Sequence, residues 1–289
     1  MPERHLTVDH CNMSSSSLIP TESQADNSLD VHPYPGDSVT SSEWVLILGA
    51  TSGIAKAIAH RLARDGHSLL LAGRNRDELD RLCSDLRLRY EMRAEAIEFA
   101  ALDFDQHPTF FENCIRRTAG RLRGVLLCYG ELQPQAITET SFSQARQVID
   151  VNFTSSVSIL SLVAAYLEQR RSGFIGVISS VAGDRGRQSN YTYGAAKAAL
   201  SVFTQGLRNR LYKSGVHVLT IKPGFVATRM TEGLVNPKSP MVATPERVAD
   251  DVIRALKRRR TVLYTPWFWR PIMSLICAIP EAVFQRMRL

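Results

Sequence analysis

Seven short apolar runs, separated by longer stretches with helical periodicity, constrain the fold of this chain more than any other feature. The runs begin at Trp44 and cover residues 44–48, 67–73, 95–103, 124–130, 173–180, 215–224 and 261–266. Runs that are apolar almost throughout are typical of parallel strands covered by helices on both faces. Strands alternating with helices in this rhythm predict an α/β fold: a single-domain, Rossmann-type, doubly wound parallel sheet of seven strands.

The 289 residues divide into three predicted parts. Residues 1–42 have no apolar core and are rich in serine, so we expect a disordered leader and no signal peptide. Residues 43–266 hold the α/β domain, in which glycine and proline residues predict a mobile substrate loop at about 229–245. Residues 267–289 form a tail rich in aromatic and basic side chains.

Charge and cysteine content exclude several kinds of partner. The formal net charge is +7, and from Asp250 to the C-terminus eight lysines and arginines face three acidic residues. A nucleic-acid binder would more often spread its basic residues over the folded domain, so we expect no nucleic-acid partner. The five cysteines are scattered without metal-ligand spacing, which favours a reducing, cytoplasmic compartment and no metal site.

The first apolar run leads directly into a glycine-containing loop, residues 49–55, and then into a helical pattern. Glycines let the backbone turn sharply and approach a pyrophosphate, which the N–H groups and dipole of a helix N-terminus attract. A plain surface turn is the alternative, and the flanking strand and helix argue against it. The sequence therefore predicts a dinucleotide site that includes Gly49, Thr51, Ser52, Gly53 and Ile54.

The second run ends at Gly73-Arg74-Asn75, where an acidic residue would bind the ribose 2′-hydroxyl of NAD. Arginine instead offers a planar, permanently charged guanidinium to the 2′-phosphate of NADP. The alternative role of Arg74 is that of a solvated residue beside a helix capped by Asn75. We therefore predict NADPH (NADP) as the cofactor.

Tyr193 and Lys197 lie four residues apart in a helical pattern, so they share one face of that helix. A free tyrosine has a pKa of about 10, too high for ready proton exchange near neutrality. A neighbouring ammonium and a positive nicotinamide ring favour the phenolate, so we expect the pKa to fall by about two or three units. Tyr193 is then the predicted general acid for a developing alkoxide.

These motifs, with Ser180 thirteen residues before Tyr193 and Asn152 upstream, resemble the short-chain dehydrogenase/reductase family over about residues 44–230. The resemblance implies an NADPH-dependent oxidoreductase that reduces a ketone to an alcohol. It implies that Ser180 hydrogen-bonds the substrate carbonyl and that Asn152 holds a water linked to the lysine. The implied catalytic residues are Asn152, Ser180, Tyr193 and Lys197.

The resemblance also extends the cofactor site, with some departures from the family pattern. Leu48 and Ala55 replace a threonine and a glycine of the family's loop, and Cys128-Tyr129 replaces an asparagine motif before Gly130. The residue after the third run is implied to contact the adenine, and the stretch after the sixth run to orient the nicotinamide carboxamide. The residues added in this way are Asp103, Gly130, Tyr193, Lys197, Pro223, Gly224, Val226 and Thr228.

The loop, the catalytic segment and the tail look most like the branch of the family that acts on a polyprenyl-phosphate-linked 2-keto-pentose. The substrate implied is a hydrophobic, lipid-linked ketone whose phosphate could meet Arg185 or Arg187. Two alternatives stay open: a reductase of β-ketoacyl or other hydrophobic ketones, and a non-enzymatic dinucleotide-binding sensor or scaffold. The complete set of catalytic residues argues against the sensor.

The tail combines Trp267, Phe268 and Trp269 with flanking arginines. Pro271 and Pro280 interrupt its apolar residues, so it offers no continuous span of about twenty residues to cross a membrane. We expect an amphipathic segment that lies on an anionic membrane surface, making a cytoplasmic protein peripheral on the cytoplasmic face. The alternative is a subunit interface within a homodimer or homotetramer.

Overall fold

The computed structural model describes residues 43–287. The leader predicted for residues 1–42 therefore lies outside the described residues, as do Arg288 and Leu289 at the end of the tail. Residues 43–287 all belong to one compact unit, Ser41–Leu289.

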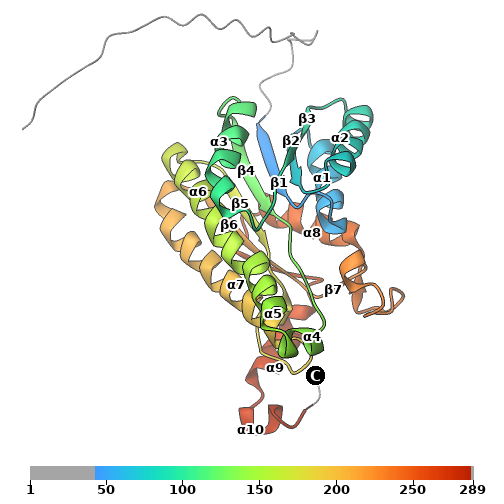
Figure 1. Ribbon diagram of the computed structural model, residues 1–289. Coiled ribbons are helices and arrows are strands. Elements are labelled where there is room, and N and C mark those ends of the chain that lie inside the picture. The colour runs from blue at the N-terminus through green and yellow to red at the C-terminus, as the bar shows by residue number, and fades with distance from the viewer. Residues whose placement is uncertain (1–42, 288–289) are drawn as a thin grey trace, which may run out of the picture. The chain divides into compact units, whose positions relative to one another are not determined.

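A parallel sheet of seven strands lies at the centre of this unit (Figure 1). Its order is β3-β2-β1-β4-β5-β6-β9, which confirms the predicted doubly wound α/β sheet. The third strand is shorter than the predicted run, because the chain leaves the sheet after Glu98. Since the strand order reverses between β1 and β4, a binding crevice is expected outside the carboxyl ends of these strands. The strands are β1 (Trp44–Leu48), β2 (Ser68–Gly73), β3 (Ala94–Glu98), β4 (Leu122–Leu127), β5 (Phe174–Ile178), β6 (His217–Pro223) and β9 (Val262–Thr265).

Helices cover both faces of the sheet, because successive side chains of a strand point to opposite faces. Val45 and Ile47 of β1 enter one apolar core, whereas Leu46 and Leu48 enter the other. Figure 1 shows the two helix layers that complete these cores. One layer contains α1 (Gly53–Arg64), α2 (Arg76–Tyr90) and α8 (Pro245–Lys257), and the other contains α3 (His107–Arg117), α6 (Ser155–Arg170) and α7 (Tyr191–Leu211).

Side-chain caps fix the starts of three of these helices. Ser52 Oγ accepts a hydrogen bond of 3.3 Å from a first-turn N–H of α1. Asn75 Oδ1 accepts one of 3.1 Å at the start of α2, which confirms the predicted cap. Thr244 Oγ1 caps α8 at 3.2 Å, with Pro245 in the first turn. Each cap satisfies a backbone donor that the helix itself leaves free.

One continuous helical segment, Phe142–Arg170, is long and apolar enough to cross a membrane by composition alone. It consists of α5 (Phe142–Ile149), a π-helical turn η2 (Asp150–Thr154) and α6, and it follows the short α4 (Gln135–Thr140). In the fold, α6 contacts both α3 and α7 and contributes to the core of its layer. Its apolar composition is that of a helix covering a sheet.

The segment after β6 has little regular structure until α8 begins. Two short strands pair with each other, β7 (Phe225–Val226) and β8 (Val242–Ala243). The predicted substrate loop, residues 229–245, begins after β7 with a 3-10 turn, includes β8 and ends at the start of α8. The four 3-10 turns in the described residues are η1 (Phe104–Gln106), η3 (Val181–Gly183), η4 (Tyr212–Ser214) and η5 (Arg229–Thr231).

The C-terminal tail folds back onto this unit as α9 (Trp269–Ala278) and α10 (Glu281–Phe284). Trp269, Met273 and Phe284 are buried, and the first two form a small apolar cluster with Val181. Within the described residues the tail therefore turns one apolar face inward, while Trp267 and Leu275 stay exposed.

Candidate active site

The residues predicted to be catalytic converge at the carboxyl ends of β4 and β5. Ser180 follows β5 directly, and Tyr193 and Lys197 lie in the first two turns of α7. Asn152 lies in the π-helical turn η2, a distortion that is frequent at functional sites. Three separate elements therefore deliver these four side chains to one edge of the sheet.

Lys197 is held in place by its own surroundings. Its side chain is only 2% exposed, and its Nζ donates a hydrogen bond of 3.1 Å to the carbonyl of Ile178. The Nζ lies 5.7 Å from the centroid of the Tyr193 ring, so the two residues share one helix face as predicted. Burial lowers the pKa of Lys197 to about 8, because desolvation disfavours the charged ammonium.

The pKa of Tyr193 differs from the sequence-based expectation. Burial raises it to about 12, and a hydrogen bond with the Ser180 side chain opposes that rise only in part. The predicted lowering by the lysine is wrong for the protein's own groups, because desolvation of the phenolate is the largest effect on this hydroxyl. At neutral pH the hydroxyl of Tyr193 is therefore protonated, the form that can donate a proton.

Asn152 acts as a clamp on the backbone beyond β4. Its Nδ2 donates to the carbonyl of Glu131 at 2.7 Å, and its Oδ1 accepts from the N–H of Glu131 at 3.2 Å. Gly130 lies next to both Asn152 and Lys197, because a Cβ at this position would come within 2.7 Å of Asn152 Oδ1 and 3.2 Å of Lys197 Nζ. Only glycine fits between these two side chains, and it brings the backbone after β4 against the catalytic lysine.

The predicted dinucleotide loop has the backbone that its sequence requires. Gly49 has a φ of +77°, and a Cβ there would lie 2.7 Å from the backbone nitrogen of Tyr129. Ser52 caps α1 and also donates to the carbonyl of Cys128 at 3.4 Å. The first turn of α1 contains no acidic residue, so the positive end of its dipole is not neutralised there. This helix start is suited to a pyrophosphate.

A cavity of about 580 Å³ lies beside the ends of β2 and β3. Both Arg74, directly after β2, and Asp103, in the segment after β3, line it. Sequence reasoning missed His107, which also lines this cavity and stacks on Phe99 at a centroid distance of 5.2 Å. Its Nδ1 lies 2.8 Å from Ser158 Oγ. No local sequence signal singles out His107, because its partners lie just after β3 and in α6.

The stretch after β6 meets the tail. Gly224 donates from its N–H to the carbonyl of Thr265 at 3.0 Å, and the indole of Trp269 packs directly against its Cα. A Cβ at position 224 would overlap that indole. Further along, the methyl of Thr228 approaches Gly53 at the start of α1. The predicted residues Pro223, Gly224, Val226 and Thr228 thus run from the tail to the dinucleotide loop.

Arg185, in the segment after Ser180, holds the end of the tail. Its Nη1 donates to the carbonyls of Ile276, Cys277 and Ile279 at 2.9, 3.0 and 2.6 Å. Its Nη2 pairs with Glu281 at 2.8 Å, and its guanidinium lies 3.9 Å from the ring centroid of Phe284. The expectation that Arg185 meets a substrate phosphate is therefore wrong, since these partners occupy its donors.

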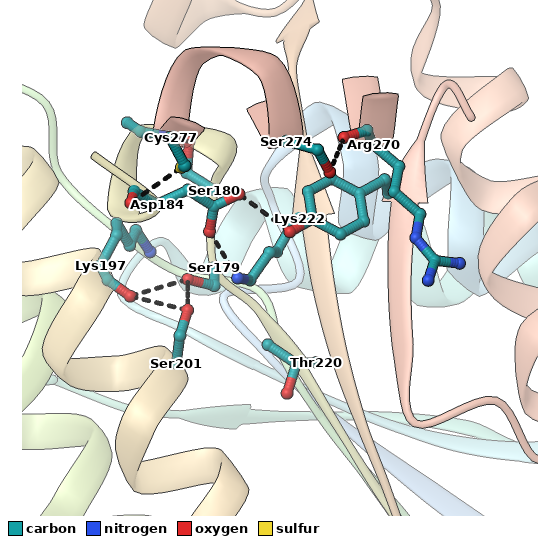
Figure 2. A network of polar contacts seen from close by, with 12 residues as sticks. Ser179, Ser180, Asp184, Lys197, Ser201, Thr220, Lys222, Arg270, Ser274 and Cys277 are labelled. Atoms are coloured by element: carbon teal, nitrogen blue, oxygen red, sulfur yellow. Dashed lines mark hydrogen bonds and ion pairs between the residues drawn. The ribbon is translucent and has the colours of Figure 1, made fainter. Parts of the chain in front are cut away.

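A second polar cluster ties the same segment to the sheet (Figure 2). Asp184 accepts from Lys222 Nζ at 2.5 Å and from the Tyr264 hydroxyl at 2.9 Å. Figure 2 also shows Ser179, whose hydroxyl donates to the carbonyl of Lys197 at 2.9 Å. A cavity of about 370 Å³ adjoins Asp184 between α7 and α9, and neither Ser180 nor Tyr193 lines it. These contacts fix the backbone on both sides of Ser180.

Among the described residues, no group of three or more histidine, cysteine, aspartate or glutamate side chains could hold a metal ion.

Comparison with known proteins agrees with this geometry. The family model of the short chain dehydrogenases matches residues 43–239. An uncharacterized oxidoreductase of Mycobacterium tuberculosis is 36% identical over 248 residues, 86% of this chain and 98% of the relative. An uncharacterized oxidoreductase of Streptomyces coelicolor is 32% identical over 255 residues, 88% of this chain and 99% of the relative.

Two solved structures extend the comparison. A short-chain dehydrogenase from Sphingobium yanoikuyae in complex with NADPH is 27% identical, with a TM-score of 0.72 over 83% of this chain and 97% of that one. The bulky-bulky ketone specific alcohol dehydrogenase from Comamonas testosteroni is 25% identical, with a TM-score of 0.69 over 84% and 97%. The expected oxidoreductase class is thereby confirmed over the sensor or scaffold, and the chain belongs to the short chain dehydrogenase family.

Proposed function

We propose that this protein is an NADPH-dependent reductase that converts a ketone to an alcohol, with Tyr193 as the proton donor. One observation carries the proposal: a protonated tyrosine, a buried lysine and a serine hydroxyl meet at the carboxyl end of β5. NADPH, when bound, supplies the hydride that adds to the carbonyl carbon.

The protein's own residues then handle the oxygen and its proton. Ser180 hydrogen-bonds the carbonyl oxygen and places it beside Tyr193, which gives its phenolic proton to the alkoxide that forms. Lys197 lies against the Tyr193 ring, and its ammonium favours the phenolate that remains after the transfer. In this proposal the Tyr193 phenolate regains its proton at the expense of the Lys197 ammonium, and Lys197 takes a proton in turn from a water held beside Asn152. The Asn152 side chain also holds the backbone of Glu131.

The preference for NADPH rests on Arg74. This exposed guanidinium lines the 580 Å³ cavity with Asp103, where the 2′-phosphate and the adenine would lie respectively. The NADPH-bound neighbour from Sphingobium yanoikuyae supports the same cofactor. We assign the pyrophosphate to the loop and helix start formed by Gly49, Thr51, Ser52, Gly53 and Ile54. We assign the nicotinamide half to Gly130, Tyr193, Lys197, Pro223, Gly224, Val226 and Thr228.

For the substrate we propose a polyprenyl-phosphate-linked 2-keto-pentose, reduced at C2. The outer face of the tail supports a substrate that lies at a membrane: Trp267 is 71% and Leu275 70% exposed, beside the exposed Arg270. Such a face suits peripheral contact with anionic lipid from the cytoplasm. A reductase of other hydrophobic ketones is the second candidate, and the ketone-specific neighbour from Comamonas testosteroni favours it.

The central test compares the wild type with Tyr193→Phe, which removes only the hydroxyl. We expect consumption of NADPH with an accepted ketone to fall by about 10²- to 10⁴-fold, while binding of NADPH, followed by its fluorescence, is retained. If Tyr193→Phe reduces the ketone at the wild-type rate, the proposed role of Tyr193 is wrong.

A separate test addresses the tail. Replacing Trp267 and Leu275 by serine should release the protein from anionic vesicles in a flotation assay, because both side chains are exposed. If flotation is unchanged, or if the substitutions instead dissociate a homodimer or homotetramer, the outer face of the tail is a subunit interface.

A further inference from the structure

Two arginines in the segment between Ser180 and Tyr193 have opposite surroundings. The donors of Arg185 are occupied by three carbonyls and by Glu281. Arg187 is half-buried, and its Nε is buried without a hydrogen-bond partner among the described residues. These two arginines are two positions apart in the chain. The protein supplies hydrogen-bond partners for Arg185 but leaves the Nε of Arg187 without one among the described residues.

Among the described residues, the acid that acts on Arg187 is shared with other donors. Burial lowers the pKa of its guanidinium, and Asp184 is the one acid that opposes this effect. Both carboxylate oxygens of Asp184 already accept hydrogen bonds, one from Lys222 and one from Tyr264. A buried donor without a partner is costly, and a structural role for Arg187 leaves its unpaired Nε unexplained.

Arg187 lies in the turn just before α7, the helix that carries Tyr193 and Lys197. Its carbonyl accepts a hydrogen bond of 3.1 Å from the N–H of Asn190, and the carbonyl of Asn190 accepts one of 2.8 Å from Gly194 in the first turn of α7. Asn190 Oδ1 is also buried without a partner among residues 43–287. A donor and an acceptor are thus unsatisfied in the turn that leads directly to Tyr193.

We propose that Arg187 binds an anionic group of the substrate, a phosphate ester attached close to the ketone. The proposal rests on the proposed function, because it assigns the phosphate to the substrate of that same site. A guanidinium presents two parallel N–H groups that match two phosphate oxygens, and such charge-assisted bonds are strong when partly desolvated. The phosphates of the cofactor are assigned elsewhere, to Arg74 and to the start of α1.

The test uses a matched pair of ketones, D-ribulose 1-phosphate and D-ribulose, which differ only in the phosphate ester on C1, the carbon next to the C2 ketone. With the wild type we expect kcat/KM to be at least about 10-fold higher for the phosphate ester. Arg187→Met should lower kcat/KM for the phosphate ester by about 10- to 100-fold and leave the value for ribulose within about 2-fold. Arg187→Lys should restore part of the loss, because it keeps the charge without the planar pair of donors.

Arg185→Met is the matched control, since it removes an arginine from the same segment. Because Arg185 holds the tail, we expect its loss to lower Tm and to affect both ketones equally. If Arg187→Met also affects both ketones equally, or if the wild type shows no preference for the phosphate ester, the assignment of Arg187 is overturned. A prenyl-phosphate-linked 2-keto-pentose, assayed beside ribulose 1-phosphate, then distinguishes a lipid-linked ester from a free one.

A binding measurement separates this proposal from the proposed function. In the NADP⁺-saturated protein, where the cofactor occupies its own phosphate sites, ribulose 1-phosphate should raise Tm for the wild type and Arg185→Met but not for Arg187→Met. If neither ketone is reduced while this pattern holds, the reductase proposal fails and the Arg187 site stands. If ribulose is reduced and no variant responds to the phosphate ester, the Arg187 site fails alone.

Discussion

The two halves of the sheet edge that carry the site are held in different ways. In the half formed by β1 and β2, caps within three residues of Ser52 and Asn75 start the helices, and Gly49 turns the backbone. In the half formed by β5, β6 and β9, Asp184 is joined to residues 38 and 80 positions away, and Arg185 to the tail 91 or more positions away. The helix starts of the first half are fixed by local contacts, whereas the backbone after β5 is held by contacts that only the folded chain can make.

The largest expected effect tests the long-range half. Trp269 is 4% exposed and packs on Gly224, so Trp269→Ala should lower the free energy of unfolding by about 3–5 kcal/mol. It should also weaken NADPH binding, because the backbone at Gly224, which is assigned to the nicotinamide half of the cofactor, loses the indole that packs against it. Urea denaturation measures the first effect, and titration of NADPH fluorescence the second.

Leu275→Ala is the control within the same helix. Its side chain is exposed, so the expected change in the free energy of unfolding is below about 0.5 kcal/mol. Equal losses for Trp269→Ala and Leu275→Ala would mean that the tail does not dock through the face described here, and the contrast between the two halves would lose its basis.

The next effect concerns pH. Burial lowers the pKa of Lys197 from 10.5 to about 8, so between these values the unfolded chain binds a proton that the folded protein does not. The free energy of unfolding therefore gains a contribution that rises with pH, by about 2–3 kcal/mol between pH 8 and 10. Above about pH 10 the raised pKa of Tyr193 acts with the opposite sign, because the folded protein then keeps a proton that the unfolded chain releases.

Denaturation of Lys197→Met at pH 8 and pH 10 isolates that contribution, which the variant should lack. Lys56→Met, in the β1–β2 half, serves as control because Lys56 is partly exposed and pairs with Glu78. A wild type whose pH dependence matches that of Lys197→Met would show that the buried lysine is not desolvated as described.

Sequence reasoning succeeded where the determinants are local and failed where they are not. The seven strands and the cap at Asn75 follow from periodicity and from residues a few positions apart. The pKa of Tyr193 was predicted to fall, and the structure raises it, because the degree of burial is a property of the packed site. The same holds for the tail, whose composition suggests a surface segment while its inner face depends on Gly224 and Val181.

A smaller effect is expected at the cofactor end. Arg74→Ala should raise the Kd of NADPH by about 10- to 100-fold and leave that of NADH nearly unchanged, because only NADPH carries the 2′-phosphate. Arg76 lines the same cavity but pairs with Asp80 at 2.8 Å, so Arg76→Ala should have less effect on NADPH. Equal losses of NADPH and NADH binding in Arg74→Ala would show that Arg74 does not bind the 2′-phosphate.

The smallest effect tests the local half directly. Asn75 is exposed and contributes one capping hydrogen bond to α2, so Asn75→Ala should lower the free energy of unfolding by about 1 kcal/mol. Asn75→Asp keeps an acceptor at the cap and adds a charge that the helix dipole favours, so its stability should stay near that of the wild type. A loss above about 3 kcal/mol in Asn75→Ala would show that α2 also depends on distant contacts. In that case the helix starts of the β1–β2 half would depend on long-range contacts, as the half that carries the tail does.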